Sequence, residues 1–149
     1  MLSDRDAMLI ALAEAEAAVA HDDVPVGAVV LVDGDVVARR HNSRELFGDP
    51  SAHAELLALR DAAEAAGTWR LERATVVSTL EPCPMCAGAL LAARVERLVF
   101  GATDPKAGAC GSLYNLCVDP RLNHEIDVVS GVLGAESGAI LAKFFATRR

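Results

Sequence analysis

The chain has 149 residues, 52% of them apolar, and this length and composition predict a single compact domain with a continuous core over residues 1–149. No apolar run approaches the roughly 20 residues that a membrane span needs, and residues 1–5 resemble neither a secretory nor a mitochondrial leader. We therefore expect a cytoplasmic protein with no membrane partner. The formal net charge of −7 argues against broad, sequence-independent binding of nucleic acid, but it is compatible with a local basic patch.

The first half of the chain predicts two helices on either side of a β-hairpin. Ser3 and Asp6 form a helix-capping pattern ahead of an alanine-rich segment, and Gly67 marks the end of the second helix. The dipeptide Asp33-Gly34 favours a tight turn between an apolar, β-branched run and the strand that returns beside it. The expected elements are a helix over 7–20, strands over 26–32 and 35–40, a polar loop over 42–50 and a helix over 51–66.

The second half predicts strands that alternate with helices. Pro82 suits the first turn of a helix, where a missing N–H group costs nothing. The expected elements are strands over 74–80, 97–100 and 126–129, a helix over 82–93, a loop of small residues over 103–111, a short helix near 112–116 and a closing helix over 134–147. This order indicates the α/β class, with a mixed five-stranded sheet covered by helices as a single-domain three-layer α/β/α sandwich.

Two short segments carry the residues best suited to chemistry, and each lies where a predicted helix begins. His53-Ala54-Glu55 supplies one imidazole, and Pro82-Cys83-Pro84-Met85-Cys86 supplies two thiols. These are three good zinc ligands, and three protein ligands leave a fourth tetrahedral position open, as in catalytic zinc sites. The start of a helix also favours thiolates, because unpaired N–H groups and the helix dipole stabilise negative charge there.

Glu55 is the candidate proton carrier beside this metal site. Zinc-bound water loses a proton near neutral pH and supplies hydroxide as the nucleophile. Residues two apart inside a helix do not face each other, so Glu55 and His53 converge only if His53 lies at the entry to the helix. In that arrangement Glu55 takes the proton from the water and delivers it to the ring nitrogen and the departing amine of a base.

Each of these residues has a plainer interpretation when it is taken alone. The histidine would be a capping or packed residue, the C-x-x-C pair a redox site without metal, and the glutamate a surface residue in a first helical turn. Together, H-x-E ahead of P-C-x-x-C is the signature of zinc-dependent nucleobase deaminases. The remaining cysteines and histidines lack ligand spacing, and we expect buried or loop thiols and non-ligating imidazoles: Cys110, Cys117, His21, His41 and His124.

Further segments extend the pattern beyond the metal motifs, and they run from about Val24 to the C-terminus. They are residues 23–28, 49–55, 80–83 and 100–109, Asn123-His124 and Phe144-Phe145. With them the chain resembles the bacterial transfer RNA adenosine deaminases, within the cytidine deaminase superfamily. The matches at 100–109 and near the C-terminus discriminate best, because free-base and nucleoside deaminases share the zinc motif.

The resemblance implies hydrolytic deamination of the wobble adenosine in a tRNA anticodon stem-loop to inosine, by a homodimer with one zinc ion per chain. It implies that His53, Cys83 and Cys86 bind the metal and that Glu55 is catalytic. By position, Asn42 and the backbone near Ala54 would bind the flipped base, and Asp104 and Lys106 would lie along its sugar and phosphate. Phe145, from the same or the partner subunit, would pack near a neighbouring base. The plainer alternatives are a turn residue for Asn42, a solvated loop for Asp104 and Lys106, and the apolar face of the last helix for Phe145.

Three alternative functions remain open at this point. The acidic charge favours deamination of a free base or nucleoside of the guanine or cytosine type, and Pro84 does not decide between these substrates because such deaminases share it. A non-catalytic RNA-binding subunit with a relic zinc site has no need of Glu55, and a redox protein would bind no metal. Two small basic groups would still let an acidic protein hold RNA locally: Arg39, Arg40 and Arg44, and Lys143, Arg148 and Arg149.

Overall fold

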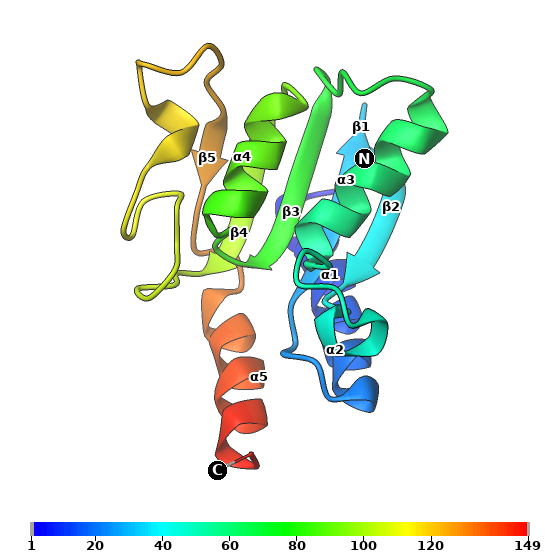
Figure 1. The fold of residues 1–149 in the computed structure, drawn as a ribbon, viewed down its shortest axis with the longest axis vertical. Coiled ribbons are helices and arrows are strands. Elements are labelled where there is room, and N and C mark those ends of the chain that lie inside the picture. The colour runs from blue at the N-terminus through cyan, green and yellow to red at the C-terminus, as the bar shows by residue number, and fades with distance from the viewer. Residues whose placement is uncertain (1, 149) are drawn as a thin grey trace.

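A five-stranded mixed sheet forms the centre of the computed structural model, which describes residues 2–148 (Figure 1). The strands are β1 (Gly27–Val32), β2 (Asp35–His41), β3 (Ala74–Leu80), β4 (Arg97–Ala102) and β5 (Asp127–Val129). They lie in the order β2-β1-β3-β4-β5, with β1 antiparallel to both β2 and β3. From β3 to β5 the strands run parallel, so helices or long loops connect them.

Helices cover both faces of the sheet, which confirms the three-layer prediction (Figure 1). The helices are α1 (Asp4–Ala18), α2 (Arg44–Phe47), α3 (Ala54–Ala66), α4 (Pro84–Ala92) and α5 (Gly134–Ala146), with 3-10 turns η1 (Val19–His21) and η2 (Leu116–Val118). One core lies between the sheet and α3 and α4, and a second lies between the sheet and α1 and α5. In β3, Val76 packs into the first core and Val77 into the second, because successive side chains of a strand point to opposite faces.

The local signals in the sequence act as predicted. The Ser3 hydroxyl accepts the Asp6 N–H at 3.0 Å and the Asp6 carboxylate accepts the Ser3 N–H at 3.3 Å, which makes a full capping box. Asp33 and Gly34 have φ angles of 53° and 85°, the pair of positive values that a tight type I′ hairpin needs. The α3 helix ends at Gly67, as expected.

Several predicted boundaries were wrong, and the largest differences lie at helix starts. The first helix begins at Asp4 instead of residue 7, because the capping box draws the preceding turn into it. Its α-helical part ends at Ala18, where the 3-10 turn η1 follows. The α3 helix begins at Ala54 instead of residue 51, and α4 begins at Pro84 instead of residue 82. In both cases a metal-motif residue, His53 or Cys83, is the extended cap of the helix. The other boundaries either agree with the prediction or differ by at most two residues.

Two segments differ from the prediction in kind. The expected polar loop over 42–50 contains the four-residue helix α2. The expected helix near 112–116 is absent from the described chain, since Cys110 and Asn115 form a β-bridge and the 3-10 turn η2 follows at Leu116. Within residues 2–148, every helix is too short or too polar to span a bilayer.

Candidate active site

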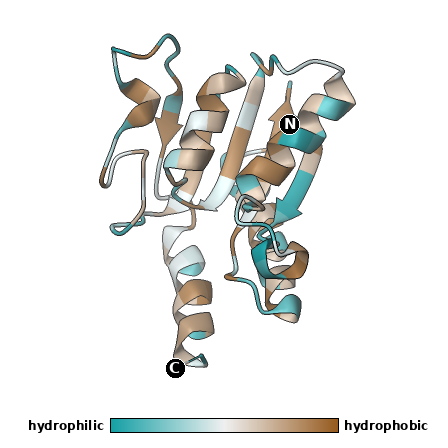
Figure 2. Ribbon diagram, viewed as in Figure 1, coloured by the Kyte–Doolittle hydropathy of each residue, from teal (hydrophilic) through white to brown (hydrophobic). Residues whose placement is uncertain are grey.

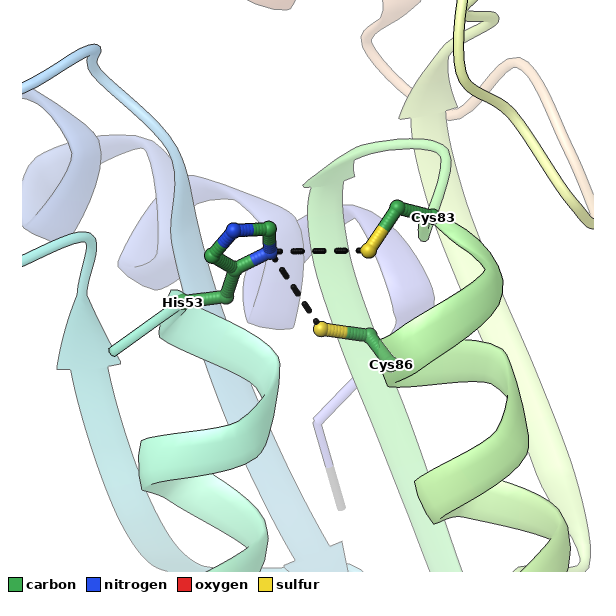
Figure 3. Close-up of side chains that lie close together, drawn as sticks. All are labelled: His53, Cys83 and Cys86. Atoms are coloured by element: carbon green, nitrogen blue, oxygen red, sulfur yellow. Dashed lines mark hydrogen bonds between the residues drawn. The ribbon is translucent and has the colours of Figure 1, made fainter. Parts of the chain in front are cut away.

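Three side chains from two helix starts converge at one edge of the sheet (Figure 3). His53 caps α3, Cys83 caps α4, and Cys86 lies in the first turn of α4. His53 Nδ1 lies 3.5 Å from the Sγ atoms of both Cys83 and Cys86. All three candidate ligand atoms lie within 4.8 Å of one another, so the predicted convergence is confirmed.

The donor set fits a zinc ion. One imidazole nitrogen and two thiol sulfurs form a common zinc-binding combination, and three protein ligands leave one tetrahedral position for a water molecule or a substrate. In residues 2–148, this is the one group of at least three His, Cys, Asp or Glu side chains with ligand atoms close enough to share an ion. The structure therefore supports a metal centre with an open position.

The pKa values of the two thiols are shifted in opposite directions. The hydrogen bond with Cys86 is the main cause that lowers the pKa of Cys83, to about 4, and the reciprocal bond to Cys83 raises the pKa of Cys86 well above its ordinary value. The hydrogen bond with Cys83 also raises the pKa of His53. A divalent cation would bind both cysteines as thiolates, so metal binding at this pair would release protons.

Glu55 and His53 converge on one cavity, which is the arrangement that the predicted proton transfer requires. Because His53 is an extended cap with φ −74° and ψ 149°, it stands outside the helix, and Glu55 in the first turn of α3 lines the same cavity. Only 4% of the Glu55 surface is exposed, and this burial raises the pKa of its carboxyl. A buried carboxyl with a raised pKa is suited to both take and give a proton near neutral pH.

A cavity of about 200 Å³ opens beside the metal ligands and Glu55. Asn42 and Ala54 line it, as the base-binding prediction requires. The Asn42 amide donates one N–H to the Val24 carbonyl at 3.1 Å, and its oxygen accepts the Arg44 N–H at 3.3 Å. One amide N–H and one oxygen lone pair of Asn42 are therefore left for a ligand.

The other predicted substrate residues divide into one at the cavity and two outside it. Asp104 lines the cavity, and its carboxylate accepts the backbone N–H groups of Lys106 and Ala107 at 3.0 and 3.2 Å. Lys106 is exposed and is not part of the cavity wall. Phe145 is 51% exposed on α5, where its ring meets the edge of buried Phe144, so Phe144 and not Phe145 fills the apolar face of this helix.

The two basic groups are mostly engaged in ion pairs. Arg39 pairs with Glu14 and Arg40 with Asp61, each at 2.9 Å, so Arg44 is the member of its group that reaches the cavity. In the C-terminal group, Arg148 pairs with Asp22, Lys143 is exposed on α5, and Arg149 lies outside the described residues.

Sequence reasoning gave no role to the buried carboxylate of Asp23, which precedes the cavity residue Val24 in the chain. Asp23 accepts the N–H groups of Glu45 and Leu46 at 2.7 and 3.1 Å, and so fixes the start of α2. It also contacts His21 at 2.6 Å, and a chain of imidazoles and carboxylates continues from there. The further contacts are His21 Nε2 to His41 Nε2 at 3.0 Å and His41 Nδ1 to Glu14 at 2.9 Å.

Glu81 is a second buried carboxylate that sequence reasoning left without a role. It is 2% exposed, lines the cavity, and lies two residues before Cys83. Burial raises the pKa of its carboxyl, but the hydrogen bonds from the neighbouring loop outweigh this and hold the pKa below its ordinary value. The sequence offered one indication of a role, because Glu81 is a lone charged residue between an apolar strand and the metal motif.

The non-ligand thiols behave as expected. Cys110 and Cys117 are buried and free of disulfides, with their sulfur atoms 3.6 Å apart. The histidines outside the metal group bond to protein atoms; His124, for example, contacts the Val95 carbonyl at 2.7 Å.

Comparison with known proteins assigns the family. The sequence matches the MafB19-like deaminase family over residues 2–149. A tRNA-specific adenosine deaminase of Bacillus subtilis (strain 168) is 51% identical over 145 residues, which cover 97% of this chain and 90% of that protein. The chain belongs to the family of tRNA-specific adenosine deaminases. The resemblance drawn from the sequence is thereby confirmed.

Solved structures place this deaminase among related enzymes. A protein from structural studies of A-to-I editing by tRNA:A34 deaminases at the wobble position superposes with a TM-score of 0.88 at 46% identity, covering 91% of this chain and 98% of that one. The guanine deaminase of Nitrosomonas europaea superposes with a TM-score of 0.84 at 26% identity, covering 98% and 86%. The fold therefore serves both RNA and free-base substrates, and the higher identity lies with the tRNA enzyme.

Proposed function

We propose that this chain converts the wobble adenosine of a tRNA anticodon stem-loop to inosine, with water consumed and ammonia released. The observation that carries the proposal is the convergence of His53, Cys83, Cys86 and Glu55 on one cavity large enough for a base. The 51% identity to a protein named tRNA-specific adenosine deaminase supports the choice of substrate. In this proposal residues 1–149 act as one zinc-dependent deaminase domain in the cytoplasm.

His53, Cys83 and Cys86 would hold the zinc ion. When bound, zinc in such a site supplies a water molecule made acidic enough to act as a nucleophile near neutral pH. Glu55 takes a proton from the attacking water, gives it to the ring nitrogen next to the reacting carbon, and then moves a proton to the departing amine. Its burial keeps bulk water away from these transfers.

Asn42 and the backbone at Ala54 would orient the base in the cavity. The free N–H and lone pair of the Asn42 amide are a donor and an acceptor for the polar edge of a purine. A nucleotide in an anticodon loop is flipped into such a pocket at a lower unstacking cost than one in a duplex. Asp104, at the cavity wall, would contact the sugar, and exposed Lys106 would contact a phosphate.

We further propose that the enzyme acts as a homodimer. The C-terminal turns of α5 extend beyond the sheet and are largely apolar (Figure 2), and Phe145 is exposed on them. A second subunit that covers part of this helix would place Phe145 beside a base that neighbours the wobble position. Sedimentation of the zinc-loaded protein gives twice the mass of one chain if this is correct, and the mass of one chain if it is wrong.

A stem-loop assay tests the substrate. Zinc-loaded protein is incubated with an anticodon stem-loop that carries adenosine at the wobble position, with a matched stem-loop that carries guanosine there, and with free guanine, cytosine and adenosine. We expect inosine and ammonia from the first RNA alone. Ammonia from guanine or cytosine without inosine in the RNA would instead favour the alternative, a free-base deaminase, which the 26% identity to the guanine deaminase and the net charge of −7 support.

A further inference from the structure

The carboxylate of Glu81 receives four hydrogen bonds from the loop over residues 103–112. Its Oε1 atom accepts the Asp104 N–H at 2.9 Å and the Ser112 hydroxyl, and its Oε2 atom accepts the N–H groups of Cys110 and Ser112, each at 3.0 Å. The donors come from both ends of loop 103–112. One side chain thus ties together the two ends of the loop.

The loop also packs tightly against this carboxyl group. A Cβ atom built on Gly108 would lie 2.3 Å from Cδ of Glu81, so the loop backbone passes directly over the carboxylate. Backbone bonds flank the contact on both sides, from Glu81 N–H to the Ala102 carbonyl and from Ala109 N–H to the Pro82 carbonyl, each at 2.9 Å. The position of loop 103–112 relative to the turn that carries Cys83 is therefore set at Glu81.

The same loop supplies Asp104 and Ala107 to the wall of the cavity. We propose that Glu81 is a positioning residue that fixes loop 103–112 for the nucleotide, so that its loss weakens binding of RNA more than it slows the chemical step. This inference rests on the proposed deamination of a stem-loop, since it assigns the RNA as the ligand that loop 103–112 receives. Glu81 lies at the cavity but acts through the loop.

The chemistry of the contact requires a carboxylate. Each oxygen of Glu81 accepts two donors, so the group uses four lone pairs and donates nothing. A glutamine at this position has one oxygen, which can accept two of the four donors. Its NH₂ group would face the other two donors and cannot accept their hydrogen bonds. The variant Glu81→Gln therefore leaves at least two of the four donors without a partner while it preserves the size of the side chain.

The test compares Glu81→Gln with wild type as full-length, zinc-loaded protein. We expect the KM for the stem-loop to rise about tenfold or more, with kcat within about threefold of wild type, because the lost bonds to a charged group loosen loop 103–112 and not Glu55. Zinc content stays unchanged. Hydrogen exchange at the amides of Asp104, Cys110 and Ser112 is expected to accelerate, with exchange in α3 unaltered.

Two variants and a control make the test independent of how well Glu81→Gln folds. Gly108→Ala pushes the loop off the carboxylate without changing charge and is expected to raise the KM in the same way. Ser112→Ala removes a single hydroxyl bond and is expected to raise it less. Glu125→Gln makes the same chemical change at an exposed acid and leaves both constants unaltered.

The outcomes separate this inference from the proposed function. A fall in kcat with unchanged KM, a loss of zinc, or unchanged KM and loop exchange in the Glu81 and Gly108 variants would overturn the positioning role. If the wild-type protein makes no inosine from the stem-loop, the proposed substrate is wrong. The exchange experiment, which needs no substrate, still decides whether Glu81 holds the loop.

Discussion

Replacement of Glu55 by glutamine is expected to remove most of the deaminase activity while the metal site stays loaded. The Glu55 side chain is 4% exposed and lines the cavity beside His53 and Cys83. Glutamine keeps the size of the side chain but neither takes up nor releases a proton at neutral pH. Proton transfer by a positioned side chain contributes about 100- to 10,000-fold to a rate, so the barrier is expected to rise by roughly 2.7–5.4 kcal/mol.

The assay for Glu55→Gln is a single-turnover experiment with enzyme in excess over a wobble-adenosine stem-loop, together with elemental analysis for zinc. Single turnover isolates the chemical step from product release. The control is Glu64→Gln, which makes the same change at an exposed position of the same helix and is expected to leave the rate unaltered. A Glu55→Gln protein with a full complement of zinc and a rate within about threefold of wild type would refute the role of Glu55 in proton transfer.

Three further changes probe the metal, the RNA contact and the fold. Cys83→Ser is expected to weaken zinc binding by more than about 100-fold, as measured by competition with a chelator. The reason is that loss of a mere hydrogen-bonding partner of a ligand already costs roughly 10–100-fold in metal affinity. Arg44→Ala removes the cavity arginine, and it is expected to raise the KM for the stem-loop and to lower the slope of log affinity against log salt by about one. Arg5→Ala, at an exposed position of α1, is expected to change neither. Asp4 is hydrogen-bonded to Arg97, which lowers its pKa, so it stabilises the fold above its unfolded pKa and loses that effect as the pH falls through the lowered value. Asp4→Asn is expected to reduce the free energy of unfolding at pH 7 by about 0.5–1 kcal/mol in urea titrations, because the ion pair that it removes is partly exposed. The free energies of unfolding of the variant and the wild type should become equal as the pH falls below about 4.

Features set by neighbouring residues could be predicted from the sequence. The Asp33-Gly34 turn and the Ser3–Asp6 capping box depend on a few adjacent residues, and both form as expected. The apolar run of β3 also indicates its place correctly, because a strand buried on both faces carries apolar residues at successive positions. The metal group was predictable because helix starts present ligands at a short, recognisable spacing.

Features that depend on contacts between distant segments could not be predicted. The α2 helix has four residues, which are too few to form a stable helix alone. It starts where the Asp23 carboxylate, 22 residues earlier than Glu45, accepts its N–H groups. The loop around Ser112 likewise takes its shape from Glu81, 31 residues earlier, instead of forming the expected short helix. The exact starts of α3 and α4 follow from His53 and Cys83, which are held outside the helices.

The residues predicted to contact RNA also divide into two groups. Asn42 and Asp104 lie at the cavity, in agreement with the positions that the resemblance to the family implied. Lys106 and Phe145 lie on the surface outside it, and their proposed contacts involve parts of an RNA or a second subunit that extend beyond the base. The resemblance therefore identified two residues of the cavity wall and two residues that lie outside it.

A zinc titration with activity as the readout tests the central claim most directly. Zinc is added in steps to metal-free protein, and inosine formation in the wobble-adenosine stem-loop is measured at each step. Since His53, Cys83 and Cys86 form the one such group in residues 2–148, activity should rise linearly and stop rising at one zinc ion per chain. Full activity in the metal-free protein, or a titration that ends without any inosine, would contradict the account.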